Sequence, residues 1–183
     1  MYRGFFRRLN LVIYLLIAVC AAILQSTVFH YWPFNYLHPD IVFVMAVYFG
    51  YRRSLVEGSL LTILASLVMQ AHSGAGQHFL LTTYVYVFLL AHLFSRLFVI
   101  KKAVATAGMG AALFALKQIG ILVLLGLQGR SQNAAQHLLL HFVPSLAVQA
   151  AILPILFELF HRLDLRTWSD AHAEDDYDLN KEI

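Results

Sequence analysis

The chain has 183 residues, of which 60% are hydrophobic and only 13% are charged, and its mean hydropathy is +0.70. This composition is too apolar for an ordinary water-soluble domain. The formal net charge of +3 comes from scattered basic residues that form no patch with interleaved aromatics, so the sequence does not predict a nucleic-acid-binding surface. We therefore expect an all-α, polytopic integral membrane protein, since each bilayer crossing needs roughly 20 apolar residues.

The first apolar segment follows three arginines, the order seen in secretory signals. The apolar run continues to Phe29 and leads into further apolar stretches, which favours a retained signal anchor over a cleaved peptide. The single cysteine, Cys20, lies within this segment and has no second cysteine for an internal disulfide. We predict that it is a small packing residue.

The apolar stretches predict six transmembrane helices, at approximately Leu9–Phe29, Pro39–Tyr51, Leu55–Ala71, Phe79–Val99, Ala103–Leu127 and Leu138–Phe160. This division places eleven of the thirteen basic residues on one side of the membrane, the bias expected of cytoplasmic turns. Arg52 and Arg53 are among them and are expected on an exposed turn. Residues 1–168 thus form one six-helix transmembrane domain with both termini inside, and residues 169–183 form an acidic, disordered cytoplasmic tail.

The second predicted span is the shortest, with about thirteen residues covering roughly 20 Å of a core about 30 Å thick. The alternative is one long helix through residues 39–71, which would bury Arg52 and Arg53 in mid-membrane and reverse the downstream charge bias. We therefore predict two helices joined by a turn. Pro39 and Asp40 are expected at the start of the first, where proline needs no N–H and aspartate complements the helix dipole.

Lys117 is the basic residue that falls inside a predicted span, about 21 Å from the inner end of its helix. A charge at that depth needs a counter-ion. Asp40 lies near an outer helix end, whereas Glu57 and Glu158 lie near inner ends, so depth favours a Lys117–Asp40 ion pair. The alternative is that the long lysine side chain extends outward to the lipid headgroups.

Small residues recur at four-residue spacing on two predicted helices. Ala18 and Ala22 share one helix face, as do Ala107, Ala111 and Ala115. Such faces permit close helix approach in a membrane. Each face could pack inside the protein or against the helix of a partner, and the sequence leaves both alternatives open.

Histidines at i, i+4 spacing, His137 and His141, could share a metal ion. A membrane di-iron site would need further ligand boxes, and the pair Glu158 and His161 occurs once. The sequence has no Ser–His–acid arrangement, dicysteine motif, phosphate-binding glycine loop or zinc-protease signature. We therefore expect no catalytic residue, metal or cofactor, and a protein that is not an enzyme.

Several short motifs follow one another in the first half of the chain. They are Gln25-Ser26-Thr27, Pro39-Asp40, Glu57-Gly58, and Gln70 followed by Ser73-Gly74. In this order they resemble the rod-shape-determining MreD family of bacterial inner-membrane proteins. The resemblance covers roughly residues 9–100, and Gln70 stands where the family frequently has aspartate.

The resemblance implies a multi-pass protein of the bacterial cytoplasmic membrane that takes part in cell elongation without catalysing a reaction. The implied partners are the MreC scaffold foremost, then the MreB filament, the glycosyltransferase RodA and a class B penicillin-binding protein, together with membrane lipid. The family is similar in architecture to the substrate-binding subunits of energy-coupling-factor transporters. A vitamin-binding subunit is therefore the alternative, and it would need a concave cavity with convergent polar groups.

Overall fold

Six helices make up the part of the chain that the computed structural model describes, residues 2–27, 39–73, 79–97, 103–127 and 131–167. Side chains are described in these ranges except at 2–9, 26, 103 and 131–140. The helices are α1 (Tyr2–Thr27), α2 (Ile41–Arg52), α3 (Leu55–His72), α4 (Phe79–Leu97), α5 (Ala103–Leu127) and α6 (Ser131–Thr167). The described residues contain no strand, so the all-helical prediction is confirmed.

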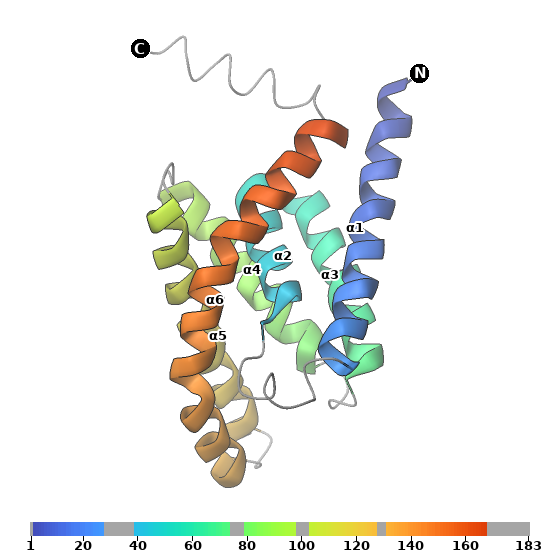
Figure 1. Cartoon of the computed structure of the whole chain (residues 1–183). Coiled ribbons are helices and arrows are strands. Elements are labelled where there is room, and N and C mark those ends of the chain that lie inside the picture. The colour runs from blue at the N-terminus through green and yellow to red at the C-terminus, as the bar shows by residue number, and fades with distance from the viewer. Residues whose placement is uncertain (1, 28–38, 74–78, 98–102, 128–130, 168–183) are drawn as a thin grey trace.

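Successive helices run in opposite directions along the bundle, so α1 begins and α6 finishes at the same end (Figure 1). The turn between α2 and α3 and the end of α4 lie toward this end as well. We call it the inner end, and the opposite one the outer end, after the sides that the charge pattern predicts.

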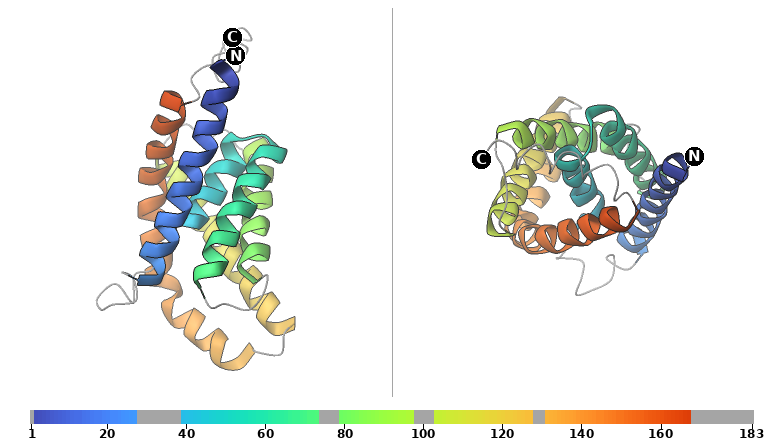
Figure 2. Two further views of the ribbon diagram at one scale, coloured as in Figure 1. Left: turned by 90° about the vertical axis from the view of Figure 1, so that its right-hand side faces the viewer. Right: turned by 90° about the horizontal axis from the view of Figure 1, so that it is seen from above.

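Helix α2 is the centre of the fold. Seen along the bundle, it is surrounded by a ring formed by the other five helices (Figure 2). Every residue from Val42 to Gly50 is buried. Its twelve residues would leave a lipid-facing helix too short for a bilayer, but protein rather than lipid surrounds this helix.

Four described helical segments are long and apolar enough to cross a membrane: Leu55–His72, Phe79–Leu97, Val104–Leu127 and His141–Thr167. The apolar parts of α1 and α2, Asn10–Gln25 and Ile41–Arg52, are shorter. The length and composition of the described helices therefore support a membrane protein with four segments long enough to span the bilayer, whereas the apolar parts of α1 and α2 fall below this length.

Helix boundaries differ from prediction mainly at the two ends of the chain. Helix α1 begins at Tyr2 rather than Leu9, and α6 extends from Ser131 to Thr167 rather than from Leu138 to Phe160. The predicted bounds were those of the apolar stretches alone. The helices are longer because the helical backbone continues through the polar residues on either side. Helix α5 has the predicted bounds.

The start of α2 is also shifted from prediction. The helix begins at Ile41, with Asp40 as its N-cap in an extended conformation and Pro39 preceding the cap. The prediction that Pro39 lies within the helix is therefore wrong. The Asp40 carboxylate accepts a hydrogen bond from the N–H of Phe43, which gives an otherwise unpaired helical N–H a partner.

One face of α1 packs inward. Ala18 and Ala22 are fully buried, and Ala18 lines a narrow apolar crevice together with Leu61 and Ala65 of α3. Of the two alternatives for this small-residue face, the structure therefore places it in internal packing, where a partner helix cannot reach it. Cys20 is exposed, so its prediction as a packing residue is wrong.

Gly50 lies where α2 approaches α4 closely. A Cβ at this position would lie 2.7 Å from both the Ala91 Cβ and the Phe88 carbonyl oxygen. Neither group can move without displacing a helix, so we expect Gly50→Ala to lower the free energy of unfolding by about 1–3 kcal/mol. The measurement is unfolding of the purified protein by sodium dodecyl sulfate (SDS) in mixed micelles.

Gly108 on α5 provides the matched control, because nothing lies within 4 Å of a Cβ built there. Gly108→Ala should be neutral, or stabilising by about 0.5–1 kcal/mol through helix propensity. If Gly50→Ala unfolds at the same SDS fraction as Gly108→Ala, the close contact between α2 and α4 is wrong.

Candidate functional site

A buried polar cluster holds the outer end of α2. We call Asp40, Tyr84, Lys117 and Gln149 the Asp40 cluster. The Lys117 Nζ forms an ion pair with the Asp40 carboxylate. The Tyr84 hydroxyl lies 3.1 and 3.0 Å from the two oxygens of that carboxylate, to which it donates. The lysine and the positive N-terminus of α2 therefore share the neutralisation of Asp40.

Gln149 of α6 binds the backbone of the residue that caps α2. Its side-chain amide donates to the Asp40 carbonyl over 2.8 Å, and its side-chain oxygen accepts from the Asp40 N–H over 3.0 Å. Gln149 is fully buried, where an unpaired backbone N–H or C=O would be costly. Gln25 of α1 donates similarly to the Pro39 carbonyl, over 2.9 Å. Side chains from α1 and α6 thus fix the chain entering α2.

The Lys117 ammonium lies among aromatic rings as well as beside the carboxylate. Its Nζ is 5.6 Å from the ring centroid of Phe43 and 5.4 Å from those of Tyr84 and Phe114. Ring faces attract a cation, most strongly where water is excluded, and Lys117 is only 8% exposed. Of the two predicted arrangements, the structure has the lysine at Asp40 rather than extended to the headgroups.

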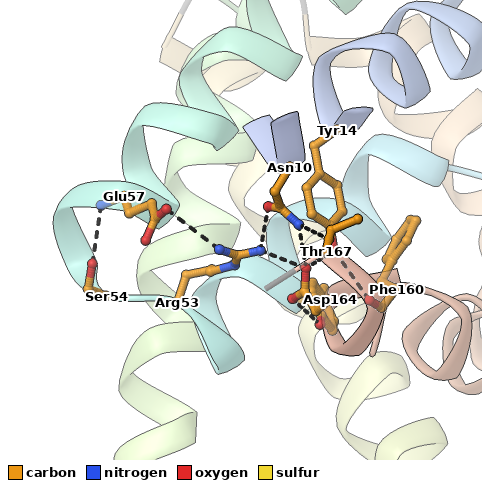
Figure 3. Close-up of polar contacts among 9 residues, drawn as sticks. Asn10, Tyr14, Arg53, Ser54, Glu57, Phe160, Asp164 and Thr167 are labelled. Carbon is orange, nitrogen blue, oxygen red and sulfur yellow. Dashed lines mark hydrogen bonds and ion pairs between the residues drawn. The ribbon is translucent and has the colours of Figure 1, made fainter. Parts of the chain in front are cut away.

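A second buried cluster holds the inner end of α2, and its centre is the carboxylate of Asp164 on α6 (Figure 3). We call Asn10, Tyr14, Tyr48, Arg53, Asp164 and Thr167 the Asp164 cluster. The donors to Asp164 and their distances are Arg53 Nη2 at 2.7 Å, Tyr14 OH at 2.8 Å, Asn10 Nδ2 at 3.1 Å and Tyr48 OH at 2.5 Å. One carboxylate therefore connects α1, α2 and the residue that follows α2.

The position of Arg53 differs most from what the charge pattern predicted. Arg53 was predicted on an exposed turn, but its side chain and that of Asp164 are each only 1% exposed. Arg53 is the C-cap of α2, where its positive charge complements the negative end of the helix. A charge buried at this site requires a counter-ion, and Asp164 supplies it from 111 residues later in the chain.

The sequence patterns did not predict four residues of this cluster: Asn10, Tyr14, Tyr48 and Asp164. Asp164 stands between two leucines near a predicted helix end, so its position was equally consistent with an ordinary membrane flank. One feature of the sequence could have indicated that Asp164 has a distant partner. Apart from His161, no basic residue lies three or four positions away from it, where a partner on the same helix would be. Nothing local could identify Arg53 as its partner.

Glu57 and Gly58 lie near the start of α3, beside the Asp164 cluster. Glu57 forms an ion pair with Arg53, with a nitrogen–oxygen distance of 3.5 Å. A Cβ at Gly58 would lie 2.6 Å from the Phe88 ring. The glycine therefore lets α3 approach α4, and the glutamate adds a second carboxylate to the buried guanidinium.

The remaining motif positions lie at the outer end of α3. The Gln70 side-chain oxygen accepts from the Leu81 N–H over 3.3 Å and so joins α3 to the beginning of α4. Ser73 is the C-cap of α3, and its N–H donates to the Gln70 carbonyl. Gly74 lies outside the described residues, as does the predicted tail, so the structure does not place them.

The described part of the chain contains no group of three or more His, Cys, Asp or Glu side chains that could hold a metal ion. The His137 side chain lies outside this part. Glu158, considered as a partner of His161 in a metal box, instead accepts a 2.8 Å hydrogen bond from Arg162 at the protein surface.

Both clusters combine an acid, a base and neutral donors that hydrogen-bond to the acid, an arrangement that fixes helices in position. Each cluster includes a residue of the central helix or its caps, and each includes a residue of α6. No protein-family model, curated protein or solved structure matches the chain. The features of the chain that bear on its function are therefore the sequence motifs and these two clusters.

Proposed function

We propose that the protein is a non-enzymatic, MreD-like component of the bacterial cell-elongation complex, which helps assemble or position peptidoglycan synthesis. The observation that carries the proposal is the ordered set of motifs that resembles this family. The structure adds support, because three of these motif positions, Gln25, Pro39 and Asp40, join α1, α2 and α5 at one end of the bundle. The motifs thus coincide with contacts that define the fold.

The alternative function, a vitamin-binding subunit of an energy-coupling-factor-type transporter, has less support. Such a site needs convergent polar groups facing a cavity. At the outer end, Lys117, Tyr84 and Gln149 are already bonded to Asp40. The crevice between α1, α2 and α3 is lined almost entirely by apolar side chains and is too narrow for a solute. Binding of a radiolabelled vitamin panel to the purified protein would reverse this preference.

The proposed function requires a defined topology. We propose six crossings in the bacterial cytoplasmic membrane, with both termini in the cytoplasm and α2 crossing inside the ring of other helices. Alkaline phosphatase, active only outside the cytoplasm, should then be inactive when fused after Arg53 and active when fused after Gly76. The opposite activities at either position would contradict the orientation that the basic residues predict.

The functional test uses the full-length protein in its own bacterium. An epitope-tagged copy should recover the MreC-like scaffold from solubilised membranes, and depletion of the protein should widen or round the cells. Re-expression of the tagged copy should restore cell width, and an unrelated multi-pass protein at equal abundance is the control for recovery. Normal width after depletion, together with failure to recover any elongation-complex partner, would contradict the proposal. Growth restored by added vitamins would favour the alternative.

A further inference from the structure

Exposed arginines mark the inner end of the bundle. The three helices that finish there each have an arginine in the last turn: Arg52 of α2, Arg96 of α4 and Arg166 of α6. All three are exposed. We call them the rim arginines. Helix α1 begins at the same end, and three further arginines lie within residues 3–8 (Figure 1).

The carboxylates at this end of α3 and α6 are already paired with other basic residues. Asp164 and Glu57 both form ion pairs with Arg53. Glu158 is paired with Arg162 one helical turn away, at 2.8 Å. Within the described residues no carboxylate lies within ion-pair distance of a rim arginine. Glu158 interacts electrostatically with Arg52 without forming an ion pair with it. As far as the described residues go, an anion from outside the bundle can therefore pair with each of the three guanidinium groups.

Exposed leucines next to the rim arginines indicate what kind of anion it is. Arg96 adjoins Leu97, which is 66% exposed, and lies three residues after Leu93, which is 54% exposed. Arg166 adjoins Leu165, which is 49% exposed. A soluble acidic partner would need only the arginines. A phospholipid uses both features, because its phosphate pairs with guanidinium while its acyl chains cover the leucines.

We propose that the rim arginines form a binding surface for anionic phospholipids of the inner leaflet. The guanidinium group suits the phosphate diester because it donates two parallel hydrogen bonds. The basic residues of a membrane flank set orientation during insertion, whereas this surface would bind headgroups in the finished protein. The inference depends on membrane insertion but not on the role in cell elongation.

The test measures lipid preference of the full-length protein. Wild type and the variant Arg52→Gln/Arg96→Gln/Arg166→Gln are reconstituted in phosphatidylcholine with spin-labelled phosphatidylglycerol or phosphatidylcholine as the probe. Wild type should bind phosphatidylglycerol in preference to phosphatidylcholine. This preference should fall by up to about fivefold for each arginine removed. High salt should weaken the wild-type preference.

The variant Glu158→Gln/Arg162→Gln is the matched control, because it removes an exposed ion pair at the same end of α6 without changing the net charge. It should leave the lipid preference unchanged. Equal loss in this variant, or an unchanged preference in the triple variant, would overturn the proposal. Displacement of the spin-labelled lipid by millimolar soluble glycerol phosphate would also overturn it, because the site would then recognise the free phosphate. If the triple variant does not fold, Arg96→Gln and Arg166→Gln are measured singly, and each should reduce the preference.

Discussion

Asp164→Asn is expected to lower the free energy of unfolding by about 3–5 kcal/mol, because it leaves the Arg53 guanidinium buried without its closest counter-ion. Asparagine keeps the size of the side chain and can still accept one hydrogen bond, so the loss reports the charge rather than a cavity. Tyr14 and Tyr48 would also donate to a weaker acceptor. The measurement is SDS-induced unfolding of the purified protein in mixed micelles.

Glu158→Gln is the control for this variant. The ion pair between Glu158 and Arg162 lies on the same helix but is exposed, with side-chain exposures of 55% and 70%. Its loss should cost no more than about 0.5 kcal/mol. The double variant Arg53→Gln/Asp164→Asn should be less destabilised than the sum of the two single variants, because both charges are removed together. Equal stability of Asp164→Asn and Glu158→Gln would contradict the buried ion pair.

Asp40→Asn is the second substitution with a large expected effect, a loss of about 3 kcal/mol. Asparagine is as good an N-cap as aspartate, so the start of α2 should persist. The loss arises because the Lys117 ammonium loses its counter-ion and keeps only a neutral amide oxygen and its aromatic neighbours, whose ring faces contribute about 0.5–2 kcal/mol. Unfolding by SDS is again the measurement.

Two double variants test the Asp40–Lys117 pair further. Removing both charges, in Asp40→Asn/Lys117→Met, should recover part of the stability lost in Asp40→Asn. Reversing the pair, in Asp40→Lys/Lys117→Asp, should not, because lysine cannot cap α2 and its charge opposes the positive end of that helix. Strict additivity of Asp40→Asn and Lys117→Met would show that the two side chains do not interact.

The sequence by itself determined the helices and their order. Hydrophobic stretches predicted all six, and the bounds of α5 agree at both residues, because helix formation in an apolar segment depends on residues close together in the chain. Depth along the helices also favoured Asp40 over Glu57 and Glu158 as a counter-ion of Lys117, since position along a span is a local quantity. The structure then decided between this ion pair and a lysine extended to the headgroups. The order of the basic residues gave the predicted orientation for the same reason.

The tertiary structure decided which residues are enclosed. Only packing shows that the short α2 lies inside a ring of helices, that Ala18 and Ala22 are buried, and that Arg53 is buried. The charge bias reports the side of the membrane on which an arginine lies, but burial depends on which residues surround it. For Arg53 these include Asn10 and Asp164, 43 and 111 residues away in the chain. Such pairs form only when the first and last helices meet around the central one.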